Sequence, residues 1–235
     1  MTTEFRTIIN KNQTGFHPVV EFDATREKLI ALDFTERNKA LTAETIEDTT
    51  QFITYINEEL KKANARFGIG GYGEHRTIYN RSRVFDAPVA GEEPRRLHLG
   101  TDIWGEPGTP VFAFMDSVIH SFAFNDQYGD YGATLVLQHT IDDFVFYTLY
   151  GHLSLADIEE LKTGDIIKRG DCIAHFGQPH ENGHWPPHLH FQVILHMEGK
   201  QGDYNGVCKY SEREKYLAKC PNPDGILQLN RYISG

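Results

Sequence analysis

The stretch Pro186-Pro-His-Leu-His-Phe-Gln-Val193 places two histidines two residues apart at the start of an apolar run. Its Phe-Gln-Val-Ile continuation has the aromatic and β-branched content of a strand. The two prolines that precede it exclude a helix. Side chains two apart on a strand point to the same face, so His188 and His190 are expected to project side by side. Two neighbouring imidazoles on rigid backbone are suited to serve a metal ion and its bound water.

The residues after Thr77 have the pattern of short strands separated by turns, with little helix. Turn residues lie between the strands, for instance from Gly105 to Gly108. Regularly spaced short strands with turn signals predict a mainly β fold with a sandwich or barrel-like core. The expected strands are Arg83–Val89, Pro110–Met115, Val118–Phe124, Thr134–His139, Phe144–Tyr150, Ile166–Ile167, Cys172–Phe176 and His190–Leu195.

The first 66 residues differ in pattern from the rest. Threonines and an aspartate within residues 42–48 are expected to cap a helix, and apolar residues then recur at mostly helical spacing up to a Lys-Lys pair. We therefore expect one amphipathic helix over residues 43–64. The glycines within residues 68–73 indicate a loop or a boundary. These observations predict an N-terminal extension, residues 1–66, and a β-rich domain with a C-terminal tail, residues 67–235.

The composition is that of a globular protein with an acidic balance. Of the 235 residues, 40% are hydrophobic and 24% are charged, and the formal net charge is −10. This charge argues against a nucleic-acid-binding surface, because such surfaces gather Lys and Arg. No window approaches the roughly 18 apolar residues of a membrane span, and residues 1–12 lack the apolar core of a signal peptide. We therefore expect no membrane span, no nucleic-acid partner and a cytoplasmic location.

Three residues upstream of the histidine pair are candidates for the same site. His98 and Asp102 lie four residues apart, which places both on one side of either a strand or a helix. Gly100 between them lets the backbone pass close to a bound ion. His152 follows an apolar strand and a glycine, which is a position well placed for a cleft. Each residue alone is more often structural, so the interpretation depends on their conjunction and order.

This conjunction resembles the lysostaphin/LytM-type zinc metallopeptidases, a family of mostly cell-wall-cleaving endopeptidases. The likeness covers about residues 67–196 and leaves the first 66 residues outside. The resemblance implies an antiparallel β-sheet core around a narrow groove. The matching motifs are His98-Leu-Gly-Thr-Asp102-Ile, Gly108-Thr-Pro-Val-Phe-Ala113, Tyr131-Gly-Ala-Thr-Leu-Val-Leu-Gln-His139, Tyr150-Gly-His-Leu-Ser154, Leu161-Lys-Thr-Gly-Asp165 and Pro187-His-Leu-His-Phe191.

The resemblance also implies a role for each matching residue. His98, Asp102 and His190 match the family's zinc ligands, and His152 and His188 match its two further catalytic histidines. Two imidazoles and a carboxylate suit Zn²⁺ and leave the fourth tetrahedral place for water. The expected activity is hydrolysis of an amide bond in a peptide or a peptidoglycan-like substrate through zinc-bound water. The two catalytic histidines are expected to flank this water, one as general base and both as stabilisers of the oxyanion.

Two rival functions stay open at this point. Some members of the family have lost ligands and serve as non-catalytic binding modules, whereas all five key positions are present here. A non-heme iron oxygenase uses overlapping ligand types, but the two additional histidines fit hydrolysis better. The sequence does not identify the substrate or the oligomeric state. The segment His184-Trp-Pro-Pro187 replaces the small Ser/Thr-Gly segment usual in the family, which is expected to reshape the groove.

Two further hypotheses concern residues outside the five. Tyr128 or Tyr131 is expected to add a hydrogen bond to the oxyanion. The N-terminal segment is a candidate inhibitor, because some relatives are latent when an upstream residue fills the fourth zinc position. Asn10, Asn12 and His17 are the side chains that offer a ligand atom for this purpose.

Overall fold

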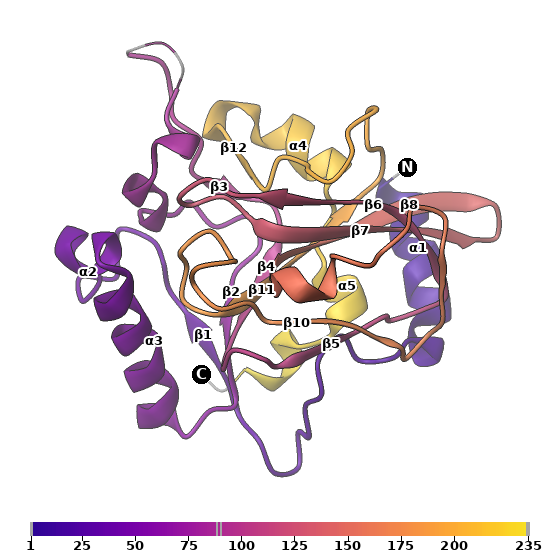
Figure 1. Cartoon of the computed structure of the whole chain (residues 1–235), viewed down its shortest axis with the longest axis horizontal. Helices are drawn as coiled ribbons and strands as arrows, with labels where there is room; N and C mark the ends of the chain where they lie inside the picture. Colours follow the sequence, from indigo (N-terminus) through magenta and orange to yellow (C-terminus); the bar gives the residue numbers. More distant parts are fainter. Residues whose placement is uncertain (1, 88, 90, 234–235) are drawn as a thin grey trace.

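The strand that carries the two histidines, β11 (His188–Ile194), lies inside an eight-stranded sheet (Figure 1). The computed structural model describes residues 2–87, 89 and 91–233. The sheet has the strand order β1-β2-β4-β11-β8-β7-β6-β9, and two small sheets pair β10 with β5 and β12 with β3. The other strands are β1 (Leu29–Leu32), β2 (Phe67–Gly70), β3 (Leu97–His98), β4 (Thr101–Trp104), β5 (Pro110–Phe112), β6 (Ser117–Asn125), β7 (Gly132–Ile141), β8 (Phe144–Leu153), β9 (Ile166–Ile167), β10 (Cys172–His175) and β12 (Val207–Cys208).

The large sheet is antiparallel except at one edge. β11 pairs antiparallel with β4 on one side and with β8 on the other. Every residue of β11 is buried, as expected of a central strand that is covered on both faces. The exception is the parallel pair of β1 with β2. The mainly β fold with an antiparallel core is therefore confirmed, and the sequence analysis did not foresee the parallel pair.

The expected strand over residues 83–89 is wrong. The described part of this segment contains a 3₁₀ helix, η3 (Arg83–Phe85), and no strand. The hydroxyl of Ser82 accepts a hydrogen bond from the backbone N–H of Val84 and so caps this turn. A local side-chain bond therefore outweighs the apolar content from which the strand was predicted.

Two of the four glycines within residues 68–73 lie in strand β2 and not in a loop, whereas Gly71 and Gly73 lie in the loop and turn that follow it, as predicted. Gly68 and Gly70 lie in β2 and pair with β1 and β4. A Cβ added at Gly68 would lie 2.4 Å from Leu32, and one at Gly70 would lie 3.0 Å from the indole nitrogen of Trp104. The glycines are required because neighbouring side chains pack directly on the strand backbone.

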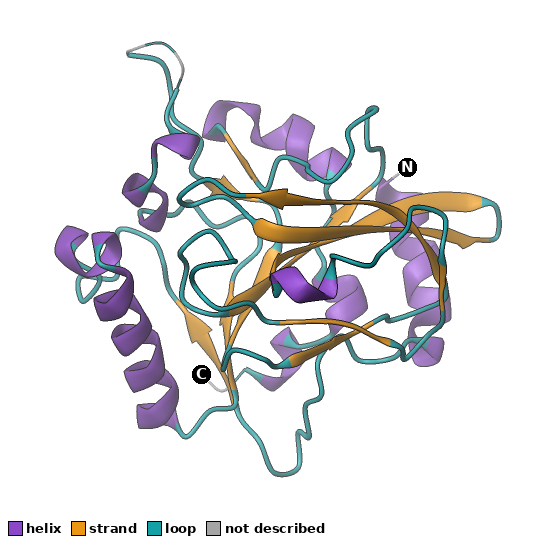
Figure 2. Cartoon of the chain, viewed as in Figure 1, coloured by secondary structure: helices purple, strands orange, loops and turns teal. Residues whose placement is uncertain are grey.

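The single helix expected over residues 43–64 is divided in two (Figure 2). Thr42 caps α2 (Ala43–Glu47), and Asp48 caps α3 (Thr49–Ala63) by accepting a bond from the N–H of Gln51. Asp48 has an extended backbone, with φ −89° and ψ 111°, so α2 and α3 are not one continuous helix. The remaining helices are α1 (Thr2–Asn12), α4 (Arg213–Lys219) and α5 (Asp224–Leu227), with short 3₁₀ turns at Gln13–Gly15, Ile78–Arg81, Leu155–Asp157, Tyr210–Glu212 and Asn230–Tyr232.

Residues before Phe67 share apolar clusters with the sheet. Phe5 and Ile9 of α1 are buried in the same cluster as the strands of the large sheet. Phe52 of α3 packs with its ring centroid 5.9 Å from that of Trp104. In Figure 1, α3 lies beside β1 at one side of the molecule and α1 lies at the opposite side. The boundary predicted after residue 66 stays a prediction; β1 before it pairs with β2 after it.

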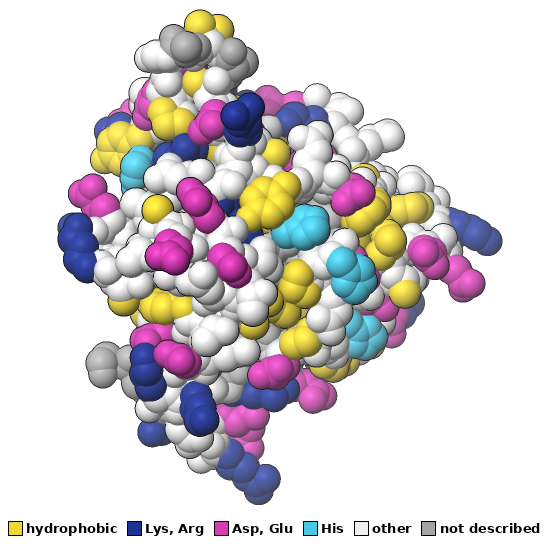
Figure 3. Space-filling model, turned by 60° about the vertical axis from the view of Figure 1, so that its left-hand side comes forward, with side chains coloured by type: hydrophobic (Ala, Val, Ile, Leu, Met, Phe, Trp, Pro, Cys, Tyr) yellow, Lys and Arg dark blue, Asp and Glu magenta, His cyan; other side chains and the backbone are white. Residues whose placement is uncertain are grey.

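Charged side chains of both signs lie on one face of the molecule. On the face shown in Figure 3, Lys and Arg side chains are interspersed with Asp and Glu, and no broad basic patch is seen there. Among the described residues, no helix is both long enough and apolar enough to span a bilayer.

Substituting Phe52→Ala tests the packing of α3. The fully buried ring would leave a cavity beside Trp104, so the free energy of unfolding is expected to fall by about 3–5 kcal/mol. Chemical denaturation measures this change. Glu58→Ala, at an exposed position of the same helix, is the control and should stay within about 0.5 kcal/mol of the parent. Equally small effects of both substitutions would contradict the packing described.

Candidate functional site

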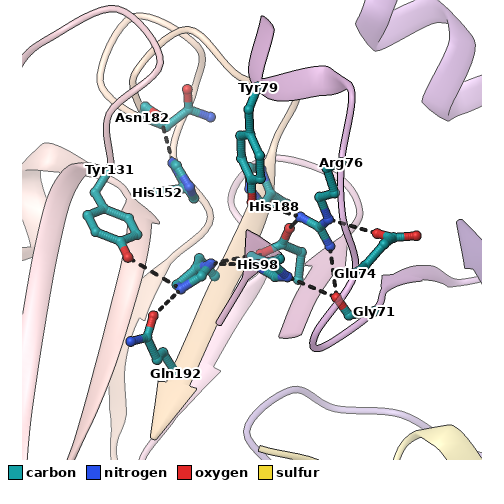
Figure 4. Close-up of polar contacts among 12 residues, drawn as sticks. Gly71, Glu74, Arg76, Tyr79, His98, Tyr131, His152, Asn182, His188 and Gln192 are labelled. Atoms are coloured by element: carbon teal, nitrogen blue, oxygen red, sulfur yellow. Dashed lines mark hydrogen bonds and ion pairs between the residues drawn. The ribbon is translucent and has the colours of Figure 1, made fainter. Parts of the chain in front are cut away.

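Three side chains from different strands each bring one potential ligand atom to a common point (Figure 4). Nε2 of His98 lies 3.0 Å from Nδ1 of His190 and 3.2 Å from Oδ1 of Asp102. Nδ1 of His190 lies 3.0 Å from the same carboxylate oxygen. The strand register produces this convergence, because His190 is opposite Asp102 in the β11–β4 pair and His98 ends β3. The structure thus brings together the three residues grouped from the sequence, and their role as ligands stays a prediction.

The cluster has the size and the donor set for a metal ion. Its three ligand atoms all lie within 4.8 Å of one another, and all three residues are buried. A tetrahedral ion bound at about 2.1 Å needs ligand atoms about 3.4 Å apart, close to the separations observed. Two imidazole nitrogens and one carboxylate oxygen are a set typical of divalent transition-metal sites. The residues therefore fit such an ion without rearrangement of the strands.

Gly100 gives the imidazole of His190 its space. A Cβ at this position would lie 2.5 Å from Cε1 of His190 and 2.9 Å from the carbonyl oxygen of Phe191. Any side chain at residue 100 would therefore displace the ring or the strand behind it. The close approach seen at this glycine is to the side chain of His190, and the expected approach to a bound ion stays a prediction.

Hydrogen bonds behind the cluster orient both imidazoles. Nδ1–H of His98 donates to the carbonyl of Gly71 at 2.9 Å, and Nε2–H of His190 donates to Oε1 of Gln192 at 2.9 Å. Gln192 in turn donates to the carbonyl of Asn205 at 3.1 Å, which fixes its amide. Each ring therefore directs its remaining lone pair to the common point, as in metal sites with oriented histidines.

A buried arginine neutralises the carboxylate. Arg76, with a side chain only 1% exposed, donates to Oδ2 of Asp102 at 2.5 Å and to Glu74 at 2.7 Å. Burial acts to raise the pKa of Asp102, but its interactions with the guanidinium of Arg76 and with the two neighbouring imidazoles outweigh burial and hold the pKa well below its usual range. Asp102 is therefore an anion at neutral pH, with Oδ1 left for the two imidazoles.

Two more imidazoles, from His152 and His188, lie beside the cluster. Their ring centroids are 4.1 Å apart. Nδ1–H of His152 donates to the carbonyl of Asn182 at 2.8 Å, and Nδ1–H of His188 donates to that of Pro186 at 2.7 Å. The Nε2 atom of each ring has no hydrogen-bond partner among the described residues, so each carries an unused lone pair. His152 has a positive φ of 64°, an unusual backbone conformation that aims its ring at this site.

Burial keeps these imidazoles neutral. It lowers the pKa of His188 to about 4 and that of His98 to about 4. It also lowers the pKa of His152 well below the usual histidine value, and the neighbouring His188 acts in the same direction. At neutral pH the rings are therefore bases and potential metal ligands.

A cleft opens over the cluster and has aromatic walls. Among its lining residues are His152, His188 and His190 together with Tyr79 and Trp185. The indole of Trp104 stacks on the ring of His188 with centroids 3.8 Å apart and an interplanar angle of 10°. Trp185, in the segment that departs from the family pattern, is 3% exposed and lies under the guanidinium of Arg81 at 4.6 Å.

The two tyrosines that were expected to bond to the oxyanion lie at different places relative to the cleft. Tyr131 lines the cleft, and its hydroxyl lies 3.5 Å from Nε2 of His190. Tyr128 is 41% exposed and does not line the cleft, because its hydroxyl bonds to Arg81 at 2.7 Å. The sequence analysis missed Tyr79, a buried phenol whose hydroxyl accepts a bond from Arg76 at 3.3 Å.

The N-terminal candidates for a blocking ligand do not reach the cleft. Asn12 donates to the carbonyl of Ile8, one turn back in its own helix. His17 lies against Phe112 and close to Gly170, near the small β5–β10 sheet. Neither these residues nor Asn10 line the cleft, so the described structure gives the latency hypothesis no support.

Residues 96–203 match peptidase family M23. We call these residues the M23 domain, after the family that they match. The resemblance identified from the motifs is therefore confirmed, and all five histidine and aspartate positions of the site fall inside the M23 domain.

Curated relatives agree with this assignment. The chain is 27% identical over 171 residues to peptidoglycan DD-endopeptidase ShyC of Vibrio cholerae, covering 72% of this chain and 36% of the relative. It is 31% identical over 153 residues to L-Ala--D-Glu endopeptidase of Bacillus subtilis, covering 60% of this chain and 44% of the relative. The chain thus spans less than half the length of either protein.

Solved structures similar to this chain include two peptidases. The catalytic domain of lysostaphin from Staphylococcus simulans is 22% identical, with 69% of this chain and 97% of that domain covered and a TM-score of 0.40. A zinc-containing peptidase from Vibrio cholerae is 32% identical, with 47% and 30% covered and a TM-score of 0.35.

Several residues that shape the site lie outside the M23 domain or its motifs. Glu74, Arg76 and Tyr79 precede the domain, and no local pattern marks them. The spacing of Gln192 from His190 could have identified it as part of the site. It lies two residues after His190 on the same strand, so period-two alternation places it on the same face as the histidine pair.

Substituting Arg76→Leu tests the buried charge network. Asp102 and Glu74 would lose their guanidinium partner in a buried setting, so the free energy of unfolding is expected to fall by about 3–5 kcal/mol. Arg26→Leu removes an arginine that is 85% exposed and should leave the denaturation curve unchanged. A curve for Arg76→Leu that overlays this control would contradict the role of Arg76.

Proposed function

We propose that this chain is a zinc-dependent endopeptidase that hydrolyses an amide bond in peptides of the peptidoglycan type. One observation carries the proposal. His152 and His188, each with an unused Nε2 lone pair, lie beside a cluster that fits a metal ion. A metal-ligand cluster alone suits a structural site, whereas paired proton acceptors next to it suit hydrolysis.

Zinc is the ion proposed for the cluster of His98, Asp102 and His190. The donor set is typical of catalytic zinc sites with three protein ligands and one open position. The hydrogen bonds from Nδ1 of His98 and from Nε2 of His190 support the same choice. They leave Nε2 of His98 and Nδ1 of His190 free to bind the ion. When bound, zinc polarises the substrate carbonyl and lowers the pKa of a water molecule.

His152 and His188 supply the proton acceptors. The attacking water has to lose a proton, and the Nε2 atom of either ring accepts it because both Nδ1 atoms are already donors to backbone carbonyls. The rings are only 4.1 Å apart, so protonation of one disfavours protonation of the other. One ring therefore holds the proton for the leaving amine, and its neighbour stays neutral.

Donors for the oxyanion come from the same wall of the cleft. The protonated imidazole is one donor. Tyr79 is a second, because its hydroxyl accepts a bond from Arg76 and keeps its own hydrogen to donate. The buried position of these groups strengthens such bonds, since water does not compete for them.

The proposed substrate class comes from the relatives. One is named as a peptidoglycan DD-endopeptidase and another as an L-Ala--D-Glu endopeptidase. Both are therefore endopeptidases that the M23 domain of this chain resembles. Trp185, in the segment that departs from the family pattern, lines the cleft, so it is expected to narrow the cleft and to select among peptides of this class.

Metal analysis tests the cluster. The purified chain is expected to hold about one tightly bound zinc ion, and Asp102→Ala or His190→Ala should lose it because each removes one of three ligand atoms. His180→Ala, at an exposed position outside the cluster, should retain it. Stoichiometric iron with oxygen-dependent turnover would instead support an oxygenase.

Kinetics test the catalytic pair. His188→Ala is expected to lower kcat by about 100-fold or more with zinc content unchanged, because it removes a proton acceptor and not a ligand. Turnover is followed by mass spectrometry of a mixed peptide and muropeptide digest. His180→Ala should cleave at the parental rate. Unaltered turnover in His188→Ala would remove its assigned role, and no cleavage by the zinc-loaded parent would overturn the proposed activity.

A further inference from the structure

A second cluster of reactive side chains lies on β10 and on the 3₁₀ turn Leu155–Asp157, outside the cleft. Figure 1 shows β10 paired with β5 in the small sheet. Sγ of Cys172 lies 3.8 Å from Nε2 of His175. Nδ1 of His175 lies 3.1 Å from both carboxylate oxygens of Asp157. The imidazole thus lies between a thiol and a carboxylate, and none of the three groups borders the cleft.

A β-bulge brings the cysteine and the histidine to one side of their strand. Residues three apart on a regular strand point to opposite faces. In the β10–β5 pair the register shifts between Cys172 and Ala174, so one residue of β10 has no partner on β5. The extra residue restores the common face for Cys172 and His175.

Asp157 fixes the imidazole before any ligand arrives. One of its oxygens also accepts the backbone N–H of His175 at 2.6 Å, so the carboxylate is held at the end of β10 by two bonds. With Nδ1–H donated to Asp157, the lone pair of His175 is on Nε2, the atom that faces the thiol. A carboxylate behind a histidine is the usual arrangement of a metal-binding imidazole.

The spacing suits a four-coordinate ion. With a metal–sulfur bond of about 2.3 Å and a metal–nitrogen bond of about 2.05 Å, a tetrahedral ion separates the two atoms by about 3.6 Å. The observed separation is 3.8 Å. We propose that Cys172 and His175 bind a thiophilic divalent cation such as Zn²⁺ or Cd²⁺, with Asp157 as the positioning residue. On binding, the thiol proton leaves to solvent and the sulfur forms the bond to the ion; the remaining positions take water.

The other two cysteines do not compete for such an ion. Cys208 and Cys220 are buried and free, and burial raises the pKa of both thiols to about 12. Cys172 is the exposed thiol among the described cysteines. The site does not depend on the proposed peptidase activity, because it shares no residue with the cleft.

Cadmium titration of the full-length chain tests the proposal. The thiolate–Cd²⁺ bond absorbs in the ultraviolet, and the cluster of His98, Asp102 and His190 offers no sulfur, so this absorption reports only on cysteine. With zinc already bound at that cluster, the parent is expected to saturate at about one equivalent of added Cd²⁺ and Cys172→Ser to show no band. His175→Gln should weaken binding at least tenfold, and Asp157→Asn by about 10–100-fold. His180→Gln, at an exposed position outside the cluster, should bind as the parent does.

Alkylation of the unmodified chain gives a second readout. Cd²⁺ or Zn²⁺ is expected to slow the reaction of Cys172 with iodoacetamide, as mapped by mass spectrometry, and to lose this effect in His175→Gln. Binding in His175→Gln equal to that of the parent would reduce the site to a single adventitious thiol and overturn the proposal. Alkylation unaffected by either ion would overturn it as well. Neither result bears on peptide cleavage.

Discussion

The site depends on one buried carboxylate that three other side chains share. Asp102 presents one oxygen to His98 and His190 and the other to Arg76. An ionised carboxylate without partners in such a setting costs several kcal/mol, so each of these groups makes the burial of the others tolerable. The shared anion therefore joins β3, β4 and β11 to the segment before the M23 domain.

Residues outside the M23 domain also shape the face that carries the histidine cluster. Phe52 of α3 packs on Trp104, and Trp104 stacks on His188. The same phenylalanine lies near Trp185, with ring centroids 6.4 Å apart. A row of rings thus runs from the N-terminal helix to a proposed proton acceptor, and the orientation of His188 depends on packing that begins about 130 residues upstream.

Much of the site was predictable from the sequence because its chemistry uses short, regular spacings. The pair His188 and His190 follows the period of a strand, and glycine next to His152 marks a strand end. Arg76 was not predictable, because Asp102, its partner in the cluster, lies 26 residues further along the chain and no spacing records this pair. The glycines of β2 were misread because glycine serves both turns and close packing, and only tertiary contacts distinguish the two uses.

Both edge strands of the large sheet are short, and one of them is partly covered. β9 at one edge has two residues, and β1 at the other has four. Ile233, close to the C-terminus, forms a bridge to Leu29 on the outer side of β1. These two strands therefore leave few backbone N–H and C=O groups of their own for strand addition by a second molecule, which limits edge-to-edge aggregation through β1 and β9.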